Sequence, residues 1–245
     1  METQEYTTNI SHHFDKFSAT ILDTAPVKIQ SIFVVGSVLT PDFLPGRSDI
    51  NSIVVMDDVS LEFLDFMVVL GKEYSAHSIA APLLMTPRYI ETSLDVFPIE
   101  FLNFQEIHHT VSGSDLLRNL SIQRTHLRLQ CEREMKSKLL WLHQGYIESL
   151  GDEQLLLERL SHSITGFIPL FRAILYLGGQ PLSLSARDTV TAIKKLTGSD
   201  NSIFEKILEL KQTPSSETGQ QLCDCFGNYY SATKHLADYV EQLAD

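Results

Sequence analysis

The sequence predicts an α/β or α+β domain followed by an all-helical one, because its pattern changes near residue 120. Up to that point, short runs of β-branched and aromatic residues alternate with amphipathic segments, and beyond it only helical patterns follow. Alternating strands and helices build a layered sheet domain, whereas successive helices build a bundle. A chain of 245 residues can bury a core for one or two domains. We therefore expect domains at 1–120 and 121–245.

Apolar periodicity and turn residues define the elements of the first half. Apolar residues recur at i, i+4, i+7 and i+11 from Ile10, which is a helical spacing, and Thr86-Pro87 has the residue types of a helix start. Continuous β-branched runs indicate buried strands, and a Pro- and Gly-containing stretch indicates a loop. The predicted elements are a helix over 10–21, a strand over 30–35, a loop over 39–47, a strand over 50–56, a helix over 61–70 that ends before Gly71, a strand over 78–85, a helix from 87 to about 94 and a strand over 97–104.

Helical patterns alone make up the second half. The segment 124–150 carries one apolar stripe, while 153–177 is apolar nearly all round and ends at Gly178-Gly179, as the central helix of a bundle would. Three further helices are predicted over 186–196, 203–210 and about 216–243. Charged residues on the helix predicted over 124–150, among them Lys136 and Lys138, have the spacing of a solvated face.

Composition narrows the classes of function and the compartment. The hydrophobic content of 43% and charged content of 20% are those of a soluble globular protein. A net charge of −12 argues against DNA or RNA as the main partner, but not against a nucleotide site in which a metal ion supplies positive charge. No basic amphipathic face or signal peptide is recognisable, and three cysteines fit a reducing compartment, so we expect a cytoplasmic protein without a membrane partner. Cys223 and Cys225 lack the second half of a metal site and are expected to be idle thiols.

Polar residues lie at the end of the strand predicted over 30–35 and at the start of the strand predicted over 50–56. Gly36-Ser37 ends the first strand, and Asp49 stands twelve positions beyond Ser37 at the start of the second. A glycine lets the backbone approach a phosphate, and a serine can hydrogen-bond it. Side chains alternate along a strand, so Asp49 and Asn51 are predicted to share one face and to offer oxygen ligands there.

Three segments together resemble the signature of the DNA polymerase beta-like nucleotidyltransferase superfamily: Gly36-Ser37, Ser48-Asp49-Ile50-Asn51, and Pro98-Ile99-Glu100-Phe101-Leu102. The layout is most similar to the small-molecule branch, which includes the aminoglycoside nucleotidyltransferases. The resemblance covers roughly the first half, and the second half resembles the helical partner domain only in general character. The chain departs from the signature at Asn51, where the family has a second carboxylate.

The resemblance implies an α+β fold in which a mixed sheet with flanking helices precedes a helical bundle that contributes the acceptor pocket. It implies transfer of a nucleoside monophosphate from ATP or another nucleoside triphosphate to a hydroxyl of a small molecule or protein. Asp49 and Glu100 would be catalytic, and Mg²⁺ would be held by Asp49, Asn51 and Glu100. Nucleotide-binding residues would be Gly36, Ser37, Arg47 and Ser48.

Several alternatives stay open at this point. Asn51 is neutral, so the chain is either a transferase or a catalytically impaired nucleotide-binding or regulatory module. Asp42, in the loop before the second strand, is the carboxylate that can fold back to replace the missing charge. Arg47 is a phosphate clamp or a solvated loop residue. The adjacent pairs His12-His13 and His108-His109 are expected to be ordinary surface histidines, since neighbouring side chains point apart. A homodimer is compatible with the sequence.

Overall fold

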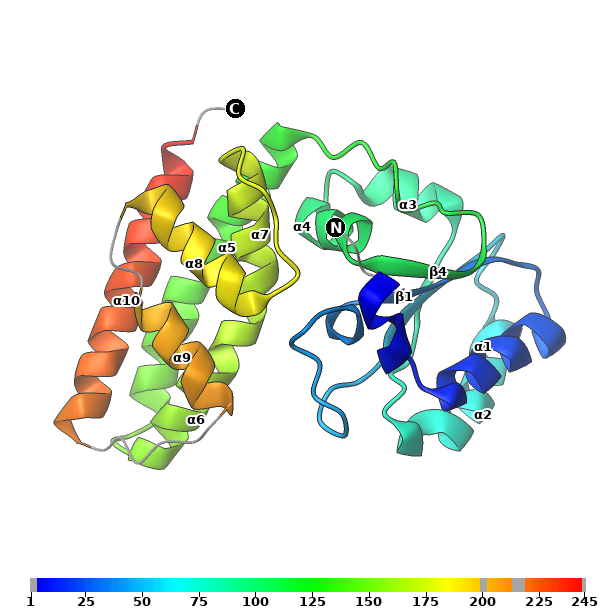
Figure 1. The fold of residues 1–245 in the computed structure, drawn as a ribbon, viewed down its shortest axis with the longest axis horizontal. Helices are drawn as coiled ribbons and strands as arrows, with labels where there is room; N and C mark the ends of the chain where they lie inside the picture. The colour runs from blue at the N-terminus through cyan, green and yellow to red at the C-terminus, as the bar shows by residue number, and fades with distance from the viewer. Residues whose placement is uncertain (1–3, 199–201, 213–218, 244–245) are drawn as a thin grey trace. The chain divides into compact units, whose positions relative to one another are not determined.

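The computed structural model describes residues 4–198, 202–212 and 219–243. The chain divides into two compact units, Met1–Ile122 and Gln123–Asp245. The first unit contains the sheet and the second contains helices only (Figure 1).

A four-stranded mixed sheet forms the centre of the first unit, with strand order β3-β2-β1-β4. Strand β1 (Ile29–Val35) pairs antiparallel with β2 (Asn51–Met56) and with β4 (His108–Gly113). Strand β3 (Leu83–Met85) runs parallel to β2. The mixed sheet with flanking helices confirms the predicted α+β fold.

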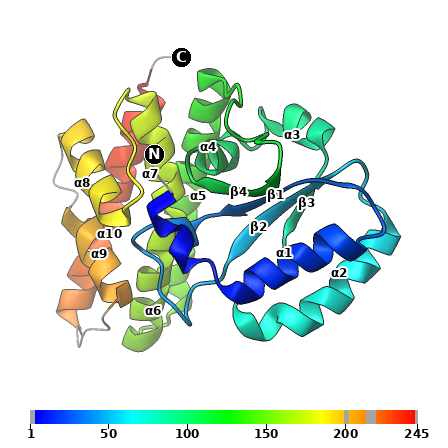
Figure 2. The same cartoon turned by 45° about the vertical axis from the view of Figure 1, so that its right-hand side comes forward.

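Helices cover both faces of this sheet (Figure 2). On one face, strand residues such as Phe33 and Val35 pack with Ile90 of α3 (Pro87–Ser93) and Phe101 of α4 (Pro98–Glu106). On the other face lie α1 (His12–Thr24) and α2 (Leu61–Tyr74). Side chains at their starts fix both helices, because Ser11 accepts a hydrogen bond from the Phe14 N–H and Ser60 accepts one from the Phe63 N–H. Short 3₁₀ helices occupy Gln4–Asn9, Ser37–Leu39 (η2) and Ser75–His77.

Several predictions in this unit are wrong. Residues 97–104 are not a strand, because Pro98 stands in the first turn of α4, where its missing N–H costs nothing. Phe101 and Leu102 are adjacent and both buried, which a helix face allows and strict strand alternation does not. The predicted strand 78–85 is reduced to β3 and an isolated bridge between Ile50 and Ile79. Helix α2 also continues past Gly71 to Tyr74.

The second unit is built from six α-helices within its described residues. They are α5 (Arg124–Glu148), α6 (Glu153–Ser163), α7 (Ile168–Leu177), α8 (Ala186–Thr197), α9 (Ser202–Gln212) and α10 (Gln220–Glu241). Aromatic rings meet in its core, where Phe204 lies 4.9 Å from Phe171 and 5.5 Å from Tyr229 between ring centroids. The predicted start of the last helix at 216 lies outside the described residues.

The prediction of one continuous helix over 153–177 is wrong. A 3₁₀ turn, η4 (Ile164–Gly166), separates α6 from α7, and Pro169 lies in the first turn of the new helix. Proline cannot donate the backbone hydrogen bond that a helix interior requires, so a new helix begins there instead.

No single helix among the described residues has the length and hydropathy of a membrane span. One bent pair meets that test together, Glu153–Gly166 with Ile168–Leu177, whose axes differ by 42°.

Candidate functional site

The turn that ends β1 has a backbone conformation restricted to glycine. Gly36 has φ 83° and ψ −153°, a region that residues with a Cβ essentially never occupy. The turn continues into η2, where the Gly36 carbonyl accepts a hydrogen bond from Leu39 N at 3.1 Å and the Ser37 carbonyl accepts one from Thr40 N at 2.9 Å. A rigid Gly-Ser turn therefore follows the strand, as the sequence predicts.

The start of β2 lies directly beside this turn. Val35, the last residue of β1, pairs with Asn51, the first residue of β2. A Cβ built on Gly36 would lie 3.8 Å from Asn51 Nδ2, so the turn and the amide are neighbours. Asp49 and Asn51 are both exposed, and Ile50 between them is fixed by hydrogen bonds from its N–H to the Ser78 carbonyl and from Ala80 N to its own carbonyl.

The loop before β2 is ordered by Ser48. Ser48 Oγ accepts a hydrogen bond from Leu44 N at 3.2 Å, and Ser48 N donates to the Leu44 carbonyl at 2.9 Å. Arg47 N donates to the same carbonyl at 3.0 Å, while the residue itself is exposed. Ser48 thus has a structural task in the loop besides the phosphate contact predicted for it. Asp42 lies in the same connection, where its N–H donates to Thr40 Oγ1.

Glu100 lies on helix α4 and is exposed, so it does not stand on a strand as the prediction for 97–104 required. Its convergence with Asp49 and Asn51 stays a prediction. Within the part of the chain that the structure describes, no group of three or more His, Cys, Asp or Glu side chains is arranged to hold a metal ion. Asp49 and Asn51 supply one carboxylate and one amide. That donor set fits a single Mg²⁺ that takes its remaining ligands from water and nucleotide phosphates, which is how proteins usually bind this ion.

A histidine with a largely covered side chain borders the same turn on its other side and was not predicted. His108 pairs with Val35 across β4, and its side chain is only 9% exposed. Its Nε2 lies 2.9 Å from Asp115 Oδ1, and its Nδ1 lies 2.8 Å from the Phe104 carbonyl. The interpretation of His108 as a surface residue is therefore wrong, whereas His12 and His13 are exposed as expected.

Asp115 is the acid that holds this histidine. Burial raises the pKa of the Asp115 carboxyl, but the His108 ring and Arg118 together lower it more, so the pKa lies below its ordinary value. Arg118 contributes both its backbone N–H and its side-chain Nε, the latter at 2.9 Å. The pair joins the start of β4 to the segment that follows its end. In the sequence, the only signal for the His108–Asp115 pair is that an acidic residue stands seven positions after the histidine.

Lys138 is the second residue that sequence reasoning misplaced. Lys136 does lie on a solvated face, where it pairs with Glu132 at 2.6 Å and Glu241 at 3.5 Å. Lys138, two positions later, is only 8% exposed and lies inside the helical unit. Cys225 is buried and Cys223 is exposed, and both are free thiols.

Comparison with known proteins gives a fold but no family. No protein-family model matches the chain, and no curated protein matches it. Among solved structures, the chain is similar to the crystal structure of spectinomycin adenyltransferase AAD(9) from Enterococcus faecialis with ATP and spectinomycin. The match has a TM-score of 0.52 and 12% identity, and it covers 95% of this chain and 100% of that one. The chain therefore has a nucleotidyltransferase-like fold along nearly its whole length.

Proposed function

We propose that this protein binds a nucleoside triphosphate, ATP in the first place, at the edge of the sheet where Gly36-Ser37 meets the start of β2. The observation that carries the proposal is the turn at Gly36, held in a glycine-only conformation next to Asn51. A turn without a Cβ lets a phosphate approach the backbone closely. The similar fold of a protein whose structure contains ATP supports the same assignment.

Phosphate contacts are assigned to four residues around that edge. Gly36 provides the close backbone approach, and the Ser37 hydroxyl donates a hydrogen bond. Arg47 is exposed on the loop, and its planar guanidinium suits two phosphate oxygens. Ser48 holds the loop that presents Arg47 and adds a hydroxyl of its own.

The proposed reaction is transfer of a nucleoside monophosphate to a hydroxyl group of a small molecule or protein. The hydroxyl oxygen attacks the α-phosphorus, the bond from that phosphorus to the bridging oxygen of pyrophosphate breaks, and the hydroxyl proton passes to a carboxylate. Glu100 is the carboxylate that we assign to this task. Asp49 and Asn51 would hold a Mg²⁺ ion, which when bound neutralises charge on the phosphates.

A second function is favoured by one specific observation. Asn51 places a neutral amide where transferases of this fold would use a carboxylate. A nucleotide-binding or regulatory module without transfer chemistry accounts for this difference. The two proposals share the nucleotide site and differ only in turnover.

Two measurements on the natural protein separate these outcomes. Thermal unfolding with ATP, with and without Mg²⁺, tests binding, because a ligand that binds only the folded state raises the melting temperature. Pyrophosphate release in the presence of candidate hydroxyl acceptors tests transfer. Stabilisation with turnover supports the transferase, and stabilisation without turnover supports the binding module. Absence of any stabilisation by ATP, with or without Mg²⁺, would contradict both.

Asp49→Ala locates the site. The substitution removes the one carboxylate at the start of β2, so Mg²⁺-dependent stabilisation by ATP should disappear, and any turnover should fall at least ~10²-fold. Because Asp49 is exposed, the melting temperature without ligand should remain nearly unchanged. Asp57→Ala, which removes another exposed acid after the far end of β2, is the matched control and should bind ATP like the natural protein.

A further inference from the structure

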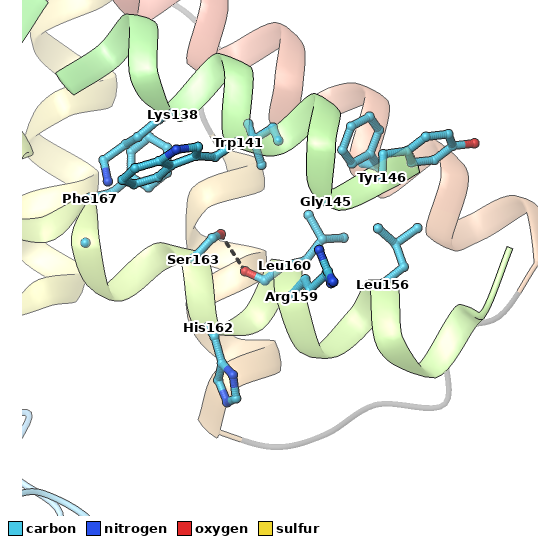
Figure 3. A pocket seen from close by; sticks show the side chains of 13 residues that line it. Lys138, Trp141, Gly145, Tyr146, Leu156, Arg159, Leu160, His162, Ser163 and Phe167 are labelled. Atoms are coloured by element: carbon cyan, nitrogen blue, oxygen red, sulfur yellow. Dashed lines mark hydrogen bonds between the residues drawn. The ribbon is translucent and has the colours of Figure 1, made fainter. Parts of the chain in front are cut away.

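A cavity of 370 Å³ opens in the helical unit, between α5, α6, η4 and α10 (Figure 3). All of its lining residues lie between 138 and 226, so it belongs to the second unit alone. Aromatic and leucine side chains form most of its wall, including Trp141, Tyr146, Leu160 and Phe226. Trp141 is 61% exposed and Tyr146 is 42% exposed, so apolar surface continues to the rim. A cavity of this kind accommodates the apolar body of a small organic molecule.

Lys138 brings a positive charge into this apolar wall. Its side chain is only 8% exposed, and its Nζ lies 4.7 Å from the centroid of the Phe167 ring and 5.8 Å from that of Trp141 (Figure 3). Gly166 leaves space for the ammonium group, because a Cβ built there would lie 3.0 Å from Nζ. Among the residues that the structure describes, none forms a hydrogen bond or ion pair with this ammonium.

The other charged groups near the cavity have partners of their own. Arg159 donates to Glu148 at 2.6 Å, and Glu134, one turn before Lys138 on α5, pairs with Arg133 at 3.3 Å. Burial lowers the pKa of Lys138, and the charge of Glu134 raises it by less. Aromatic faces replace the hydration of an ammonium group only in part. An acceptor supplied by a ligand would give this ammonium a charge-assisted hydrogen bond.

We propose that this cavity binds an organic anion with one acid group on an apolar body, the acid meeting Lys138 Nζ and the body lying against Trp141, Tyr146 and Phe226. The acid accepts a charge-assisted hydrogen bond from the ammonium, and the body displaces water from the apolar wall. The site does not depend on the nucleotide site, since every residue in it belongs to the helical unit.

Trp141 is the only tryptophan in the chain, so its fluorescence reports directly on the cavity. The probes are cyclohexanecarboxylate and octanoate, each compared with its neutral amide, because none of these absorbs where tryptophan is excited. Both acids should change Trp141 emission saturably and bind at least ~tenfold more tightly than their amides, the preference expected from one hydrogen bond to a charged group. The preference for the acid should be lost in Lys138→Met. It should persist in Lys136→Met, the matched control that removes an exposed ammonium from the same helix.

Three results would overturn the proposal. The acids and amides could bind equally well, the acid preference could persist in Lys138→Met, or neither acid could alter Trp141 emission at millimolar concentration. The last result would mean that Lys138 is a structural cation held by aromatic rings alone. If Lys138→Met does not fold, Lys138→Gln is used in its place. The comparison of acid with amide on the natural protein tests the acid preference without any variant.

Discussion

Gly36→Ala tests whether the Gly-Ser turn is fixed by backbone conformation. The built Cβ meets nothing closer than Asn51 Nδ2 at 3.8 Å, an ordinary contact, so a steric clash contributes nothing. The cost is therefore the strain of placing alanine at φ 83°, which amounts to ~1–3 kcal/mol. We expect the free energy of unfolding to fall by that amount.

Alanine substitutions at two other glycines should change the free energy of unfolding in opposite directions from the Gly36→Ala value, one stabilising the protein and one costing more. Gly71 lies within α2, has open space around it and has an ordinary φ, so Gly71→Ala should stabilise the protein by ~0.5–1 kcal/mol. Gly113 combines φ 84° with a built Cβ only 1.9 Å from the Gln30 carbonyl oxygen. Gly113→Ala should therefore cost more than the ~3 kcal/mol at the upper end of strain alone.

Urea unfolding followed by far-UV circular dichroism measures the three changes at 25 °C. Hydrogen exchange of peptides from β1 and β2 assigns the Gly36 effect to the first unit, whereas Trp141 fluorescence follows the second. From the most to the least stable, the expected order is Gly71→Ala, the natural protein, Gly36→Ala and Gly113→Ala. A Gly36→Ala variant as stable as the natural protein would refute the argument that the turn requires glycine.

Three further predictions concern charge. Lys138→Met should raise the free energy of unfolding at pH 7 by ~1 kcal/mol or more, because it removes a buried charge. Burial lowers the Lys138 pKa, so this gain should shrink as alkaline pH neutralises the lysine in the folded state. A gain independent of pH would contradict this prediction. Asp115→Asn should cost ~1.5–3 kcal/mol at pH 7 by weakening the bond to His108. The Asp115 pKa is lowered, so that cost should vanish as pH falls through it, which acid titrations of both forms would check. Asn51→Asp should tighten binding of Mg²⁺ with ATP by ~tenfold in calorimetry, and equal affinity would mean that residue 51 does not contact the ion.

The sequence was informative where local chemistry and tertiary structure agree. The β-branched runs of β1 and β2 are buried on both faces, and Gly36 stands where only glycine fits, so both strands and the turn between them could be predicted. The N-caps Ser60 and Thr86 were equally readable, because each accepts a backbone hydrogen bond three residues ahead.

The errors arise where tertiary contacts decide the outcome. Strand β4 reads His-His-Thr-Val-Ser-Gly, a polar run that becomes a strand because it pairs with β1 along the edge of the sheet. The segment after Phe97 contains strand-forming residues, yet Pro98 starts a helix there. Lys138 has the sequence surroundings of a solvated residue, and only the packing of Phe167 and Gly166 against α5 shows that it is buried.

The central claim is that a nucleoside triphosphate binds where Gly36-Ser37 meets β2. A structure of the natural protein with a non-hydrolysable ATP analogue and Mg²⁺ tests this claim most directly. We expect the triphosphate beside Gly36 and Ser37, with Asp49 or Asn51 as a ligand of the ion. An analogue bound elsewhere, for example with its phosphates on Lys138 in the helical unit, or no bound analogue at millimolar concentration, would contradict the claim.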